Sequence, residues 1–280
     1  MKKDGYAEQT IKYTGNRLKM LAKSVNLDKP EEIKEYIANK NGKNSYKEAI
    51  ADAYARYVKY NELTWKKPIY HRASQPPYVP TEEEVTILIS NAGQKYAMIL
   101  SILRDTGMRP IELHRSTLRW YDLQRGLVNV ETAKHGAGRT LQLKPQTLAM
   151  LKDYVSKHEF RLNDHPFPKV ISMNKSLQRI RNRAAKKLQR PELRRICLYS
   201  FRHYFATMLY HKTKDILHVK GKMGHRNLKN TLIYTHLVNF KNDEYTVKAV
   251  EKVNEACKLI EAGFEYVTEM GNLKLFRKRK

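Results

Sequence analysis

The sequence predicts a mainly α-helical protein with a small antiparallel β-sheet, an α+β fold divided into two domains. Three observations lead to this expectation. Apolar residues recur at helical spacing along most of the 280 residues, and prolines cluster at 76–80. Two short segments of alternating hydrophobicity, 126–132 and 139–143, flank a glycine-rich run.

Residues 1–75 are expected to form a small helical domain of three helices. The apolar residues of the first helix are Ile11, Leu18, Leu21 and Val25, and Pro30 opens the second helix. A third helix follows Ser45, because Ser45 and Glu48 have the spacing of a capping box.

The prolines of residues 76–80 remove N–H donors and hold the chain extended, so this stretch is interpreted as a linker. A second domain then occupies 81–280. Thr81 and Glu84 have capping-box spacing, and the run from Tyr96 to Leu103 is apolar enough for a buried helix.

Further elements are expected in order along the second domain. The two strands are joined through Lys134-His135-Gly136-Ala137-Gly138, and Pro145 opens a helix that ends near His158. A basic helix at 175–190 is expected to bind DNA through Lys175, Arg179, Arg183, Lys186 and Lys187. Helices dominate from 199 to 262, with the last at about 242–262, and a hairpin around Gly271 precedes a basic tail.

The composition favours a partner with many phosphates. With 54 Lys and Arg against 28 Asp and Glu, the net charge is +26, and the calculated isoelectric point is near 9.9. Basic ribosomal or membrane-surface proteins share this balance, but a chain that is 41% hydrophobic can bury a core. The two cysteines and the absence of metal-ligand spacing predict no disulfide framework, no metal and no cofactor. The longest apolar run, 97–103, predicts no membrane segment, so a cytoplasmic protein is expected.

Three short motifs carry candidate catalytic residues. Arg109 lies in Thr-Gly-Met-Arg-Pro-Ile-Glu-Leu, before a proline that suits the first turn of a helix. Arg202 lies in Tyr-Ser-Phe-Arg, and His225 follows Met-Gly. Tyr234 comes nine positions after His225. Arginine can bind two phosphate oxygens at once, and a phenolate can attack phosphorus, so the set suits DNA backbone cleavage.

These motifs resemble the catalytic domain of the tyrosine recombinases, the integrase and Xer-like family, over roughly residues 80 to 240. The resemblance implies that Tyr234 forms a 3′-phosphotyrosine while Arg109, Arg202 and His225 stabilise the transition state. It implies that Glu112 orients Arg109, and that Lys134 protonates the leaving 5′-oxygen. His135 and Arg139 are alternatives to Lys134.

One position departs from the family pattern. Tyr199 stands where the second box, His-x-x-Arg, has its histidine, three residues before Arg202. A tyrosine can donate a hydrogen bond to a phosphate but is a poor base at neutral pH, since its ordinary pKa is about 10. Tyrosine here is similar to what some archaeal plasmid and virus integrases carry. His203 and Tyr204 are interpreted as packing residues or as support for the site.

The resemblance also implies partners. Residues 1–75 would be the core-binding domain, which closes with the catalytic domain as a C-shaped clamp on duplex DNA. The protein would be a monomer or dimer when free and a homotetramer on DNA, with no membrane and no small-molecule substrate. Two alternatives remain: a type IB topoisomerase, which uses the same chemistry, and a DNA-binding regulator with impaired catalysis, which the substitution at Tyr199 would explain.

Overall fold

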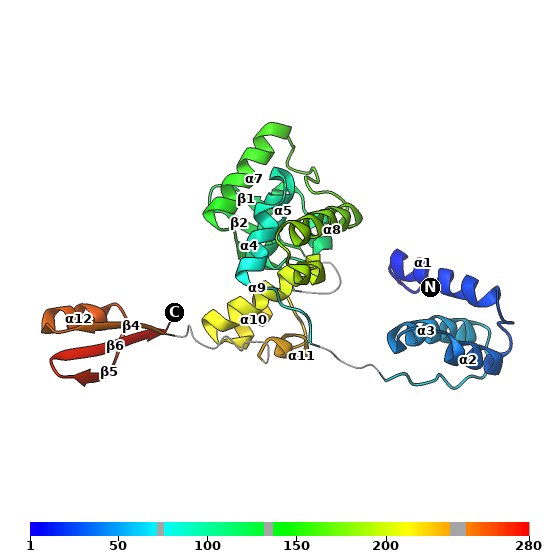
Figure 1. Ribbon diagram of the computed structural model, residues 1–280. Helices are drawn as coiled ribbons and strands as arrows, with labels where there is room; N and C mark the ends of the chain where they lie inside the picture. The colour runs from blue at the N-terminus through cyan, green and yellow to red at the C-terminus, as the bar shows by residue number, and fades with distance from the viewer. Residues whose placement is uncertain (72–75, 132–136, 236–244, 280) are drawn as a thin grey trace. The chain divides into compact units, whose positions relative to one another are not determined.

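The computed structural model describes residues 1–71, 76–131, 137–235 and 245–279, and the chain divides into two units, Met1–Gln75 and Pro76–Lys280. The first unit contains α1 (Glu8–Ala22), α2 (Pro30–Asn39) and α3 (Asn44–Tyr60), as expected (Figure 1). Its core is formed by apolar residues of all three helices, among them Leu21, Ile33, Ile37, Ile50 and Tyr54.

One of the two expected capping boxes is wrong and the other is confirmed. Helix α3 begins at Asn44 with Lys43 as its N-cap, and no side chain caps it. Ser45 is therefore inside the first turn, where its hydroxyl is not in the capping position. In the second unit, Thr81 Oγ1 accepts from the N–H of Glu84, and the Glu84 carboxylate accepts from the N–H of Thr81.

The second unit contains a helical core around the buried helix α5. The helices are α4 (Glu82–Ser90), α5 (Gln94–Thr106), α6 (Pro110–Arg115), α7 (Pro145–His158), α8 (Val170–Lys187), α9 (Leu198–Thr213), α10 (Ile216–Met223) and α11 (Lys229–Leu232). Short 3-10 helices are η1 (Leu118–Trp120), η2 (Pro191–Arg195) and η3 (Ile233–Thr235). α5 packs against α4, α7 and α9. Its side chains from Ala97 to Leu103 are all buried, as their apolar run predicts.

A small antiparallel sheet lies beside this helical core. Its strands are β1 (Tyr121–Asp122), β2 (Leu127–Val130) and β3 (Arg139–Gln142), in the order β1-β2-β3. Val128 pairs with Leu141, and both are buried, which fixes the register of the two expected strands. The sequence does not predict β1, since two residues are too few to show a pattern. Lys134 and His135, between β2 and β3, lie outside the described residues.

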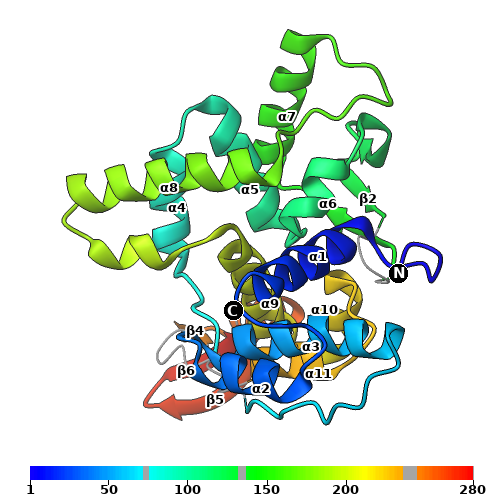
Figure 2. The ribbon, with the colours of Figure 1, turned by 90° about the vertical axis from the view of Figure 1, so that its right-hand side faces the viewer.

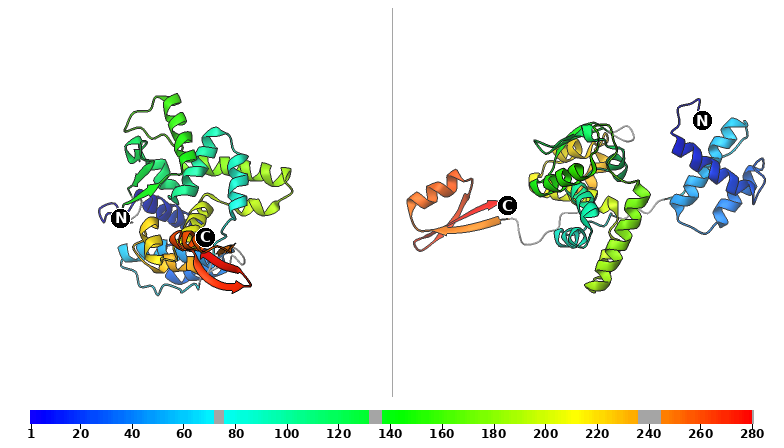
Figure 3. Two further views of the ribbon diagram at one scale, coloured as in Figure 1. Left: turned by 90° about the vertical axis from the view of Figure 1, so that its left-hand side faces the viewer. Right: turned by 90° about the horizontal axis from the view of Figure 1, so that it is seen from above.

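The C-terminal segment differs from expectation. Residues 245–250 form a strand, β4 (Tyr245–Val250), and only α12 (Val253–Glu261) of the expected helix at 242–262 is helical. Val247 and Ala249 alternate with Lys248, a period-two pattern that favours a strand. The expected hairpin is confirmed as β5 (Glu265–Met270) and β6 (Leu273–Arg279), in the sheet order β4-β6-β5. Figure 3 shows α12 along one face of this sheet, where Ala256, Leu259 and Phe276 are buried together.

The helix α8 has one apolar and one basic side. Met173, Leu177, Ile180 and Ala184 are buried in the core of the unit, whereas Lys175, Arg179, Arg183, Lys186 and Lys187 are exposed. Figure 2 shows the helix projecting from the body of its unit. None of the helices that the structure describes is long and apolar enough to cross a membrane.

Candidate active site

The turn between α5 and α6 places Arg109. α5 ends at Thr106, and its C-cap is Gly107, whose positive φ of 58° favours glycine; Arg109 is then the N-cap of α6, with Pro110 at the first helical position. Glu112, one turn further, accepts a 2.6 Å bond from Arg109 Nη1 and a 2.8 Å bond from the Arg109 backbone N–H. The carboxylate therefore holds both the side chain and the backbone N–H of Arg109, the residue that the resemblance expects Glu112 to orient.

Glu112 is also shared with a second arginine. Arg139 Nη2, at the start of β3, donates to Glu112 Oε2 at 2.8 Å, and both side chains are almost fully buried. Burial acts to raise the pKa of Glu112, but Arg139 and Arg109 outweigh it, and the pKa is lowered below its usual range. Glu112 is thus an anion that holds two guanidinium groups in place.

Arg202 lies on the buried side of α9. Its Nη1 donates to the carbonyl of Gly107 and its Nη2 to the carbonyl of Met223, both at 2.6 Å. These bonds tie the end of α5 to the end of α10 through one side chain. Burial, with Arg109 and Arg139 nearby, lowers the pKa of Arg202 to about 10, so it stays charged at neutral pH.

His225 follows the left-handed Gly224 that ends α10. Its Nε2 is 3.0 Å from Arg202 Nη2, and its Nδ1 is 3.0 Å from Thr231 Oγ1. Because the guanidinium can only donate, Nε2 accepts, and Nδ1 of the neutral ring carries the hydrogen. Burial and the three arginines, Arg202, Arg109 and Arg139, lower the pKa of His225 to about 4. The imidazole is therefore neutral at pH 7 without DNA.

Tyr234 lies on η3 and is only 2% exposed. Its hydroxyl is 3.1 Å from Nδ1 of His203 on α9, and the two rings are tilted with centroids 5.9 Å apart. Burial raises the pKa of Tyr234, and the positive charges of Arg202 and Arg109 act in the opposite direction. The candidate nucleophile is thus a protonated phenol at neutral pH, in a positively charged surrounding.

The structure brings four of the sequence-predicted residues into one cluster: Arg109, Arg202, His225 and Tyr234. Tyr199 is in the first turn of α9 and 48% exposed, and within the described residues its hydroxyl makes no hydrogen bond. Its role stays a prediction. The assignment of Lys134 falls outside the described residues.

Two residues of this cluster make contacts that the sequence does not predict. Arg139 is expected only as an alternative to Lys134, and His203 only as a packing residue or as support for the site. Arg139 is 27 positions from Glu112, and His203 is 31 positions from Tyr234, so no local spacing connects them. The sequence gives one indication for each residue: Arg139 directly follows the glycine-rich connection, and His203 directly follows Arg202.

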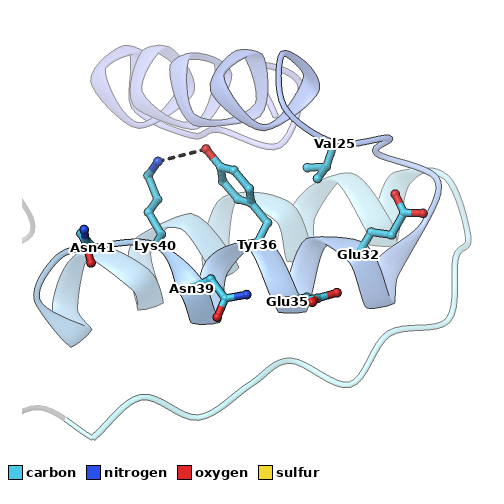
Figure 4. Close-up of a pocket in the computed structure, with 7 residues that line it drawn as sticks. All are labelled: Val25, Glu32, Glu35, Tyr36, Asn39, Lys40 and Asn41. Atoms are coloured by element: carbon cyan, nitrogen blue, oxygen red, sulfur yellow. Dashed lines mark hydrogen bonds between the residues drawn. The ribbon is translucent and has the colours of Figure 1, made fainter.

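A cavity in the first unit does not suit a phosphate. The first unit contains a cavity of about 540 Å³. Figure 4 shows that Glu32 and Glu35 line it together with Tyr36 and Lys40, and Lys40 Nζ donates to the Tyr36 hydroxyl at 3.0 Å. Its carboxylates would repel an anion. Within the residues that the structure describes, no three His, Cys, Asp or Glu side chains are grouped to hold a metal ion.

Known proteins resemble the chain in sequence and fold. The sequence pattern of the phage integrase family matches residues 80–240. The tyrosine recombinase XerA of Pyrococcus furiosus is 26% identical over 215 residues, which cover 73% of each protein. The tyrosine recombinase XerA of Saccharolobus solfataricus is 30% identical over 146 residues, covering 51% of this chain and 46% of that protein.

Among solved structures, the Tn1549 transposon integrase in complex with transposon right end DNA shares the fold. Its TM-score is 0.65 at 15% identity, over 92% of this chain and 94% of that one. The family pattern covers more than half of the chain, so the chain belongs to the phage integrase family and is a tyrosine recombinase. The expected α+β fold is confirmed, and neither alternative class is favoured.

Proposed function

We propose that this tyrosine recombinase cleaves and rejoins duplex DNA at specific sites through a covalent bond between Tyr234 and a 3′-phosphate. The observation that carries the proposal is the buried phenol of Tyr234 in a cluster with Arg109, Arg202 and His225. A cluster of fixed positive charge is what the pentacoordinate phosphorus of an in-line displacement requires.

Each residue has a distinct role in the proposed step. Tyr234 attacks the phosphorus, and Arg109 and Arg202 neutralise the non-bridging oxygens. Both guanidinium groups are already held by protein acceptors, so little order is lost when the phosphate arrives. Lys134 would protonate the leaving 5′-oxygen. Because the phosphodiester is exchanged for a phosphotyrosine, the rejoining step needs no ATP.

His225 would change its partners when DNA binds. Its Nε2 accepts from Arg202 in the structure, so it has no hydrogen to give to a phosphate. A phosphate anion would offset the arginines that depress the pKa of His225, and so favour a ring with both nitrogens protonated. His225 would then donate to the phosphate through Nε2.

We also propose double-stranded DNA as the partner, with a homotetramer assembled on it and a cytoplasmic location. The Tn1549 integrase of similar fold is in complex with transposon end DNA, which supports DNA as the partner. The exposed basic residues of α8 are proposed to contact DNA phosphates. Residues 1–75, with 16 basic and 9 acidic residues, would form the second arm of a clamp.

A two-stage experiment tests the proposal. A library of nicked duplexes with a randomised core is incubated with the protein, and covalent adducts are recovered and sequenced to define a site. Two copies of that site are then placed on one plasmid. Recombination should yield deleted or inverted products, whereas a topoisomerase would only relax supercoils, and a non-catalytic regulator would give no adduct.

A further inference from the structure

His203 lies next to the nucleophile, although the proposed mechanism gives it no role. It follows Arg202 on α9 and is half-buried, and its Nδ1 is 3.1 Å from the Tyr234 hydroxyl. Within the described residues, this is the one hydrogen bond of the Tyr234 hydroxyl. The contact is between the reacting oxygen and a nitrogen that can accept a proton.

Tyr234 needs such an acceptor. A phenol whose pKa is raised by burial must lose its proton as it attacks, and the arginines around it can only donate hydrogen bonds. His225 does not serve as this acceptor, because Arg202 and Thr231 occupy its Nε2 and Nδ1 in the structure, and the ring proposed for the phosphate-bound state carries a proton on both nitrogens. Tyr199 is 48% exposed and is itself a phenol.

We propose that His203 is the general base of the cleavage step. The proton on the Tyr234 oxygen moves to Nδ1 of His203 as the bond from that oxygen to phosphorus forms. The bond from phosphorus to the 5′-oxygen breaks, and this oxygen takes a proton from the leaving-group acid. In the rejoining step, His203 returns its proton to the departing phenolate oxygen. His203 is thus a catalytic residue that performs the base chemistry absent at position 199.

The surroundings keep this imidazole ready to accept a proton. Burial, and then the charge of Arg202, lower the pKa of His203 below its ordinary value, so the ring is neutral at pH 7. Within the described residues, the ionisable groups that contact this ring or act on its pKa are Tyr234 on η3 and Arg202 on its own helix. With Nδ1 as acceptor, the hydrogen of the neutral ring is on Nε2.

The test rests on the proposed function, and uses the full chain and the nicked duplex selected from the randomised library. Single-turnover adduct formation is compared for the unmodified protein, His203→Asn and His218→Asn. Asparagine can place an acceptor oxygen near the position of Nδ1 but cannot take a proton. His218, exposed on α10, is the matched control. Duplex affinity and thermal unfolding are measured for each protein.

We expect His203→Asn to form adduct at least about 100-fold more slowly, the scale of general-base catalysis, with unchanged affinity and unfolding. His218→Asn should match the unmodified protein. Placing a fluorinated tyrosine at position 234 lowers the phenol pKa, and should restore most of the rate to His203→Asn. A sulfur in place of the bridging 5′-oxygen, which needs no protonation, should not restore it.

Three results would overturn the inference. A His203→Asn rate within threefold of the unmodified protein would remove His203 from the chemistry. A slow His203→Asn variant whose rate of adduct formation is not restored by the fluorinated tyrosine would show that the role of His203 is structural. If the sulfur leaving group restores the rate of His203→Asn, His203 acts as the general acid and not as the base. If instead the unmodified protein forms no adduct with any duplex, the proposed function itself fails.

Discussion

The contacts of Glu112 in the structure allow the effect of Glu112→Gln on the free energy of unfolding to be estimated. The carboxylate is fully buried and accepts hydrogen bonds from the side chains of Arg109 and Arg139 and from the backbone N–H of Arg109. Glutamine keeps the volume but removes the charge, and turns one acceptor oxygen into an NH₂ group. At least one charge-assisted hydrogen bond is lost, and the new amide N–H group faces an N–H donor of Arg109 or Arg139.

The expected loss is about 3 to 5 kcal/mol in the free energy of unfolding of the second unit, the scale for removing one partner of a buried ion pair. Urea unfolding at pH 7 measures it. The chain has two tryptophans, Trp65 in the first unit and Trp120 in the second. In a Trp65→Phe background, the fluorescence of Trp120 therefore reports on the second unit alone. DNA cleavage should also slow, since Arg109 loses its support.

The stability that the Glu112 carboxylate contributes should fall as the pH becomes acidic. Arg139 and Arg109 hold the pKa of Glu112 below its unfolded value, which is about 4.3. The stability that the carboxylate contributes is therefore complete above about pH 4.3 and is lost as the pH falls through the lower folded pKa. Glu112→Gln should differ most from the unmodified protein at neutral pH, and the difference should shrink in acid.

The matched control is Glu192→Gln. Glu192 also pairs with an arginine, Arg190 at 2.7 Å, but its side chain is 38% exposed. Its loss should cost less than about 1 kcal/mol. A Glu112→Gln protein as stable as the control would show that the carboxylate does not hold the two arginines in place.

Four further results are expected. Tyr199→Phe should raise the activation free energy of adduct formation by about 1 to 2 kcal/mol if the Tyr199 hydroxyl donates to a phosphate, and full activity in a single-turnover assay would show that the hydroxyl has no part in cleavage. Gly224→Ala should destabilise the protein by about 1 to 3 kcal/mol in urea unfolding, because φ is +63° and the added carbon would lie 2.9 Å from Arg139 Nη1; an unchanged midpoint would contradict this. NMR titration should find the pKa of His225 raised from about 4 when duplex DNA is bound, and a fall would exclude contact with a phosphate. Deleting residues 1–75 should flatten the decline of log affinity with log salt, by roughly 0.9 for each phosphate that these residues neutralise, and an unchanged slope would show that they do not bind DNA.

Local sequence patterns predict the parts of this protein that depend on neighbours along the chain. Arg109 and Glu112 are one helical turn apart, so their contact follows from the start of a helix at Pro110. Helix α7 begins at Pro145 and ends at His158 as expected, because a proline and a basic last turn mark its ends. The hairpin of β5 and β6 follows from its glycine turn.

Local sequence patterns do not predict contacts between segments that are distant along the chain. The pairing of Arg139 with Glu112 depends on where β3 lies relative to α6, and the bond between His203 and Tyr234 depends on the packing of η3 against α9. The expectation of a helix at β4 is wrong, because the strand forms by pairing with β6, almost thirty residues away, and its own alternation is too short to reveal this partner. Ser45 shows that a capping-box spacing does not fix where a helix begins.

Mass spectrometry of the covalent DNA adduct measures directly whether Tyr234 is the nucleophile. Trypsin cleavage after Lys229 and Lys241 releases a peptide of residues 230–241, in which Tyr234 is the one tyrosine. We expect a nucleotide to be attached to this peptide through a 3′-phosphate, and Tyr234→Phe to yield no adduct while duplex affinity is unchanged. A nucleotide attached to a peptide with any of the other tyrosines, or an adduct that persists in Tyr234→Phe, would contradict it.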